Sequence, residues 1–353
     1  MQKNQDIWVS KMKDPQRKTQ LKWFGYGVMA FSLAGATFLS FGWPFFHFIT
    51  YGGKKNQSKQ TLSGAGERKK WFRLKHTQIN HPKHKYEKEY NDTKAWCEAQ
   101  KMQDWYVRSM DGLKLHASYL PAEHAKRIVL LSHGYRGTRY GSIAHIAPYL
   151  HEQGCDLLFI DQRCCGESEG EYITFGAKEQ LDVLEWIRKL HENNPQKLPI
   201  YLYGQSMGAT TILLAAGHVL PKEVKGLIAD CGFHSMKQQL RDIASGWFHL
   251  HFVELLLWRV DLFCRLHAGF SMKETDTTEA LRKNTLPVLF FHGERDTYVW
   301  PENTCKNYEL CRAPKELVMV PGARHLCASY AAPEYYKKKL ALFFKKCEGI
   351  HLS

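Results

Sequence analysis

The stretch from Leu198 to Gly217, LPIYLYGQSMGATTILLAAG, constrains the fold more than any other part of this 353-residue chain. Pro199–Tyr203 is short and apolar, as a buried strand is, and Ala209–Ala216 holds the small and aliphatic residues of a buried helix. Between them stands Gly-Gln-Ser-Met-Gly, in which a serine on a tight strand-to-helix turn projects its Oγ clear of the backbone. The alternative is an ordinary glycine-rich turn. The flanking strand and helix favour a nucleophile at Ser206.

Apolar runs and helical patterns alternate along the chain after residue 104. The first two expected strands, 105–109 and 113–120, are joined at Met-Asp-Gly and predict a hairpin. Further strands are expected at 127–132, 155–160, 199–203, 226–230, 288–291 and 316–320. Helices are expected at 95–104, 143–153, 176–192, 209–216, within 236–269 and at 333–346. This alternation predicts a mainly parallel sheet with helices on both faces.

Two loops that follow predicted strands offer the partners that a serine nucleophile needs, namely a base that removes its proton and an acid that orients the base. His-Gly-Glu-Arg-Asp ends at Asp296, and Pro-Gly-Ala-Arg-His ends at His325. His325 is therefore the expected base and Asp296 the expected acid. Glu294 is a rival acid, and three other histidines near strand ends are rival bases: His133, His234 and His292.

An oxyanion hole needs two N–H donors beside the nucleophile. Met207 follows Ser206 at the start of the expected helix and supplies the first donor. The second is expected from Tyr135, in the loop His-Gly-Tyr-Arg-Gly after the strand 127–132.

Five motifs follow one another at these intervals: HGYRG, DQRCCGESEG, GQSMG, HGERD and GARH. With them, residues 105–346 resemble the α/β-hydrolase superfamily, and most of all its serine-aminopeptidase-like group, which includes monoacylglycerol lipases, esterases and prolyl aminopeptidases. Bacterial members with an N-terminal membrane segment are the most similar. The resemblance implies the order Ser206, Asp296, His325 for a catalytic triad and an acyl-enzyme mechanism without a metal or organic cofactor.

The chain departs from that group's D-x-R-G-x-G-x-S loop at Cys164 and Cys165, which follow the arginine. We expect these adjacent cysteines to be a packing substitution, and a redox-sensitive pair is the alternative. None of the ten cysteines forms a C-x-x-C pair, so a structural zinc site is not expected.

The formal charge of +14 is concentrated at the N-terminus. Residues 1–90 hold 17 Lys and Arg against 5 Asp and Glu, whereas the remaining residues hold 32 and 30. The basic charge therefore belongs to an appendage, which argues against nucleic-acid binding and favours attraction to anionic lipid.

Residues 23–53 contain no Asp, Glu, Lys or Arg and are almost continuously apolar. They are long enough to cross a bilayer as a helix, and they predict a single-pass anchor between a basic tail, 1–22, and a basic linker, 54–94. A signal peptide and a buried core helix are the alternatives. Because basic residues flank both ends, the sequence does not show on which side of the membrane residues 95–353 lie. The linker histidines His76, His81 and His84 are expected to be solvated and not to bind a metal.

An insertion at 232–278 carries the strongly apolar run 248–270, which we expect to form a cap over an acyl pocket. The sequence thus predicts a membrane-anchored serine hydrolase that acts on a small acyl ester. The alternatives are a peptidase or amidase that uses the same triad on a short peptide, and a catalytically silent binding module.

Overall fold

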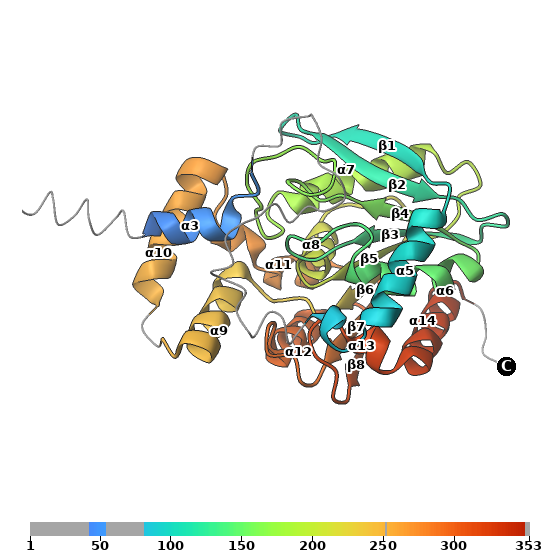
Figure 1. The fold of residues 1–353 in the computed structure, drawn as a ribbon. Coiled ribbons are helices and arrows are strands. Elements are labelled where there is room, and N and C mark those ends of the chain that lie inside the picture. Colours follow the sequence, from blue (N-terminus) through green and yellow to red (C-terminus); the bar gives the residue numbers. More distant parts are fainter. Residues whose placement is uncertain (1–41, 54–80, 251–252, 350–353) are drawn as a thin grey trace, which may run out of the picture.

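The computed structural model describes residues 42–53, 81–250 and 253–349. These residues form an eight-stranded sheet in the order β1-β2-β4-β3-β5-β6-β7-β8 (Figure 1). Strands β1 and β2, and β2 and β4, pair antiparallel, and every later pair is parallel. The strands are β1 (Gln103–Arg108), β2 (Lys114–Leu120), β3 (Arg127–Ser132), β4 (Cys155–Ile160), β5 (Ile200–Gln205), β6 (Val224–Asp230), β7 (Val288–Gly293) and β8 (Lys315–Val320).

Helices cover both faces of this sheet (Figure 1). Helices on one face are α7 (Glu179–Glu192), α8 (Met207–Ala215) and α11 (Thr278–Lys283), and those on the other are α5 (Glu87–Ala99), α6 (Ala147–Glu152) and α14 (Pro333–Cys347). The remaining elements are α3 (Gly42–Thr50), α9 (Met236–Phe248), α10 (Glu254–Phe263), α12 (Pro301–Leu310), α13 (Ala328–Ala331) and the short turns η2 (Pro82–His84), η3 (Ser142–Ile146), η4 (Cys264–Ala268) and η5 (Met272–Thr275).

Alternate residues of the central strands point to opposite faces and fill two separate cores. In β3, Ile128 and Leu130 pack under α7 and α8, whereas Val129 and Leu131 face α6 and α14. Both sets are at most 3% exposed. Because the strands are buried on both faces, they are continuously apolar, as parallel strands between two helical layers must be. The predicted mainly parallel sheet, with helices on both faces, is confirmed.

Several element boundaries differ from those predicted. Helix α5 begins at Glu87, inside the stretch predicted to be a linker, and it ends at Ala99, short of the predicted end at 104. Its buried Thr93 and Cys97 attach it to the domain. Helix α12 was not predicted, because its sequence PENTCKNYEL has few apolar residues to mark a helix. The predicted cap run 248–270 is divided between the end of α9, helix α10 and η4.

The C-terminal part of the predicted membrane anchor lies on the domain. Residues 42–50 form α3, which packs against α10 (Figure 1). Its Phe46 is fully buried. The rest of the predicted anchor, 23–41, lies outside the described residues, as do the basic tail 1–22 and most of the linker. Among the residues that the structure describes, no helix is both long enough and apolar enough to span a bilayer.

Candidate active site

Ser206 lies on the turn between β5 and α8, where the sequence predicted it. Its φ of 53° and ψ of −120° place a non-glycine residue in the left-handed half of backbone space, which costs energy and is typical of functional turns. Two glycines make the turn possible. A Cβ on Gly204 would lie 2.3 Å from the carbonyl oxygen of Gly208, and a Cβ on Gly208 would lie 2.0 Å from that of Ser132.

We expect Gly208→Ala to lower the free energy of unfolding by about 3 kcal/mol, the upper range for an added methyl group in a packed interior, because its methyl group would meet backbone that cannot move aside. Chemical denaturation measures the change. An unchanged midpoint would show that α8 shifts easily and that the close approach of α8 to β3 is not required.

The structure brings Ser206, His325 and Asp296 together from three separate loops. The Oγ of Ser206 lies 3.0 Å from Nε2 of His325, and Nδ1 of His325 lies 2.6 Å from Oδ2 of Asp296. All three residues are at most 5% exposed. With Nδ1–H donating to the carboxylate, Nε2 is left to accept the serine proton. This arrangement can activate a hydroxyl as a nucleophile.

Asp296 is fixed on both of its oxygens. Oδ1 accepts hydrogen bonds from the backbone N–H groups of Tyr298, at 2.8 Å, and Val299, at 2.9 Å. Burial alone would raise the pKa of Asp296, but the charge of His325 and the hydrogen bonds from His292 and His325 outweigh it and hold the pKa below its ordinary value. The acid is therefore ionised at neutral pH.

The rival acid and two of the rival bases do not contact the Ser206–His325 pair in the hydrogen bonds described for them. Glu294 is exposed to solvent, so it does not compete with Asp296 for the buried imidazole. Nδ1 of His133 lies 2.8 Å from the carbonyl oxygen of Gly134, and its Nε2 accepts from the backbone of Gln162. Nδ1 of His234 is within hydrogen-bond distance of side chains of Thr277 and Asn307.

His292 is the supporting residue whose role the sequence did not reveal. Its Nε2 lies 3.2 Å from Oδ2 of Asp296 and 2.9 Å from the carbonyl oxygen of Val299, and its Nδ1 lies 2.7 Å from Oγ1 of Thr304. It thus stands behind the acid and ties it to α12. Tyr298 was also missed, and its ring lies 4.9 Å from that of His325. The only signal for either was proximity to Asp296 in the sequence.

The two residues predicted to supply oxyanion donors, Met207 and Tyr135, belong to segments that adjoin Ser206. Met207 is the first residue of α8, where a helix leaves its N–H groups without partners within the helix. Gly134 lies against the serine from the other side, since a Cβ there would be 3.8 Å from its Oγ. Tyr135 follows directly, so its backbone lies beside the site, and the donation of its N–H to an oxyanion stays a prediction.

An apolar cluster is built from side chains of α3, the insertion and the segments beside this site. We call it the cap cluster; its buried members are Phe46, Cys164, Ile173, Phe175, Ala177, Met207, Phe233, Met236, Val260, Cys264, Ala268, Phe270, Met272 and Val299. Tyr135 and Tyr298 pack against it. Because Met207 belongs to the cluster and adjoins Ser206, apolar side chains reach the candidate nucleophile. Cys164 packs in the same cluster, as the packing interpretation of the cysteine pair predicts.

All ten cysteines are free thiols. Among the residues that the structure describes, one group could hold a metal ion: Cys231, Asp296 and His325, whose ligand atoms lie within 4.8 Å of one another. Burial raises the pKa of the Cys231 thiol well above its ordinary value, so the thiol stays protonated. A protonated thiol is a poor metal ligand. Asp296 and His325 already form a hydrogen bond with each other.

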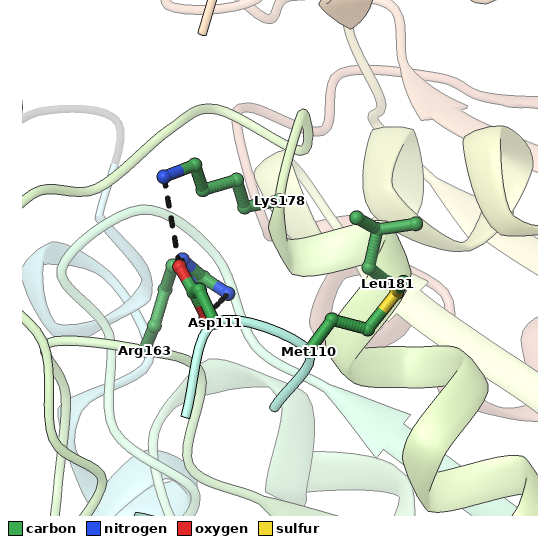
Figure 2. A pocket seen from close by; sticks show the side chains of 5 residues that line it. All are labelled: Met110, Asp111, Arg163, Lys178 and Leu181. Carbon is green, nitrogen blue, oxygen red and sulfur yellow. Dashed lines mark hydrogen bonds and ion pairs between the residues drawn. The ribbon is translucent and has the colours of Figure 1, made fainter. Parts of the chain in front are cut away.

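A surface hollow is lined by Met110, Asp111, Arg163, Lys178 and Leu181 (Figure 2). Arg163 reaches Asp111 at 3.0 Å and Asp182 at 2.7 Å, and Lys178 points toward Asp111 at 3.5 Å. The charges that line the hollow therefore pair with one another. They tie the loop after β4 to the β1–β2 turn and to α7.

Comparisons with known proteins agree with this architecture. Residues 123–278 match the family described as serine aminopeptidase, S33. The uncharacterized protein YqkD of Bacillus subtilis (strain 168) is 26% identical over 237 residues, which cover 67% of this chain and 77% of that protein. The uncharacterized protein YfhR of Escherichia coli (strain K12) is 24% identical over 233 residues, with 65% and 70% covered.

Solved structures with a similar fold include esterases. The esterase Pf2001 of Pyrococcus furiosus aligns with a TM-score of 0.57 at 22% identity, over 72% of this chain and 93% of that one. Est1E of Butyrivibrio proteoclasticus, solved with ferulic acid bound, gives 0.53 at 21% identity, over 69% and 99%. An acylaminoacyl peptidase gives 0.51 at 16% identity, over 70% of this chain and 41% of the peptidase.

The strand order, the turn at Ser206 and these likenesses lead to one conclusion about the fold. The described domain has the α/β-hydrolase fold.

Proposed function

We propose that this chain is a serine hydrolase that cleaves carboxylic esters through an acyl-enzyme intermediate. The observation that carries the proposal is the hydrogen-bonded chain from Oγ of Ser206 through His325 to Asp296.

Ser206 attacks the ester carbonyl, and Nε2 of His325 takes its proton and returns it to the leaving alcohol. Asp296 keeps the imidazole oriented and stabilises it while it is charged. The backbone N–H groups of Met207 and Tyr135 receive the developing oxyanion. Water, activated by the same histidine, then releases the acid.

The cap cluster favours an acyl substrate over a polar one, because the side chains next to Met207 are apolar. The matched family description and the peptidase fold neighbour favour a second candidate, cleavage of short peptides. An aminopeptidase site needs a carboxylate for the substrate's amino group. The buried carboxylate of α9, Asp242, already accepts hydrogen bonds from Gln238 and Asn303, so it is not available for that task.

We further propose that residues 23–41 form a single-pass membrane anchor. These 19 residues carry no charged side chain, which at 1.5 Å per residue is close to the thickness of a hydrocarbon core. The proposed span is shorter than the predicted anchor, 23–53, because α3 packs on the domain and residues 42–53 are therefore not part of the span.

A fluorophosphonate probe tests the hydrolase proposal on the full chain in detergent. We expect labelling of the folded protein, none after heat denaturation, and a kcat/KM for p-nitrophenyl acyl esters at least a hundredfold above that for aminoacyl anilides. Folded protein that stays unlabelled would overturn the hydrolase proposal in favour of a silent binding module. Faster cleavage of the anilides would support the peptidase instead.

A further inference from the structure

The C-terminal end of α3 is capped by the loop that carries the predicted oxyanion donor. A helix leaves its last carbonyl groups without partners inside the helix. The guanidinium of Arg136 donates to the carbonyl oxygen of Phe48, at 2.6 Å, and to that of Tyr51, at 3.2 Å. The hydroxyl of Tyr135 donates to the carbonyl oxygen of Ile49 at 2.6 Å. A cation at a helix C-terminus also interacts favourably with the helix dipole.

The segment that follows α3 is held by a second loop of the domain. The backbone N–H of Ile173 donates to the carbonyl oxygen of Thr50 at 2.7 Å, and that of Gly52 donates to Glu171 at 2.8 Å. The approach is close, since a Cβ on Gly52 would lie 2.3 Å from that of Cys164. These contacts fix residues 50–53 beside the loop 164–173.

Side-chain packing fixes the other face of α3 on the insertion. Phe46 is fully buried in the cap cluster, with its ring 5.5 Å from that of Tyr172 and 6.1 Å from that of Phe263. A Cβ on Gly42 would lie 2.7 Å from Cβ of Arg259 on α10. Thus α3 packs against α10 (Figure 1), and its C-terminal end contacts the loop that carries Tyr135.

The loop that contacts α3 has a strained backbone at Arg136 and lies against Ser206 at Gly134. Arg136 has a φ of 52°, a left-handed conformation in which glycine would be free of strain and arginine is not. Two residues earlier, Gly134 lies against Ser206. Tyr135 lies between these two residues, one of which contacts the serine while the other contacts α3.

We propose that Arg136 and the hydroxyl of Tyr135 are positioning residues that use α3 as a fixed support for the oxyanion loop. This inference rests on the proposed serine-hydrolase function. In this inference α3 belongs to the catalytic domain and is not a tether. The side chains of Arg136 and Tyr135 hold the loop in place, in addition to the backbone N–H that Tyr135 contributes. Displacing a donor from the transition state lowers kcat more than it raises KM, since the donor bonds the oxyanion more strongly than the substrate carbonyl.

Substitutions in the full chain test this support. We expect Arg136→Ala to lower kcat for an acyl ester by about tenfold, less than the loss of a whole oxyanion donor, with KM changed less than twofold. Arg136→Lys, which can reach one carbonyl group but not two, is expected to recover part of that loss, and Tyr135→Phe to lower kcat by a smaller factor. The control is Arg188→Ala on α7, which removes an exposed arginine that pairs with Glu185 and is expected to leave kcat unchanged.

A double-mutant cycle identifies α3 as the support. Phe46→Ala removes the buried anchor of α3, and we expect Arg136→Ala to have little further effect on kcat in its presence, because both changes free the same loop. Independent, multiplicative effects on kcat would overturn the inference, and so would an Arg136→Ala variant with wild-type kcat. A loss of kcat that Arg136→Lys does not recover at all, or that only follows a fall in melting temperature, would overturn it too. These outcomes are separate from the hydrolase proposal, which fails if folded wild-type protein stays unlabelled by the probe or if the Ser206→Ala variant keeps its activity.

Discussion

Ser206→Ala is expected to lower ester hydrolysis about a millionfold and to abolish fluorophosphonate labelling, because its Oγ is the hydroxyl that faces Nε2 of His325 at 3.0 Å. Without the Oγ, His325 has no proton to accept and no acyl-enzyme can form. The backbone of residue 206 has a φ of 53°, which alanine tolerates no worse than serine does. The fold is therefore expected to persist in the variant. Burst kinetics with a p-nitrophenyl ester and probe labelling of matched protein samples measure the change.

Ser245→Ala on α9 is the matched control, since it removes a hydroxyl that donates only to the carbonyl oxygen of Asp242. Its activity is expected to stay within twofold of wild type. Residual labelling of Ser206→Ala at the wild-type rate would place the nucleophile elsewhere and sink the triad hypothesis.

The central part of the fold could be predicted because local sequence and global topology agree there. Strands β3 and β4 were predicted at the residues where they are found, since an apolar run between two polar loops has few alternatives. The C-terminal ends of parallel strands meet at one edge of the sheet. Loops that follow β5, β7 and β8 were therefore bound to converge, and the side chains of Ser206, Asp296 and His325 do so.

Features that depend on contacts between distant segments were not predictable. The apolar run 23–53 has the composition of a membrane span throughout, and composition does not show that Phe46 packs against Phe263, more than 200 residues away. In the same way, the sequence places His292 and Tyr298 near a strand end but does not show that they contact Asp296 and His325. Helix α12 is held mostly by polar contacts, such as Asn303 with Asp242, which leave no apolar period in the sequence.

Asp296→Asn is expected to lower kcat about 10⁴-fold while the substrate still binds, because an asparagine amide can present its N–H to Nδ1 of His325 and stabilise the wrong tautomer. Nε2 would then carry the proton and could not accept another from Ser206. The loss of negative charge also removes the partner that stabilises the imidazolium in the transition state. Steady-state kinetics on an acyl ester measure the change in kcat and KM separately. Glu294→Gln, in the same loop but exposed, is the control and is expected to be within twofold of wild type.

The same substitution is expected to change how stability depends on pH. The carboxyl of Asp296 has a pKa below its unfolded value of about 3.9, so its ionised form stabilises the fold above that pH, and the contribution is lost as the pH falls through the lower, folded pKa. The free energy of unfolding of wild type minus that of Asp296→Asn is therefore expected to shrink as the pH falls below about 4. Urea denaturation of both proteins at pH 7, 5 and 3 measures this difference. A difference that grows at pH 3 would mean that burial dominates, that the pKa of Asp296 is raised, and that the acid is not held ionised by His325 and His292.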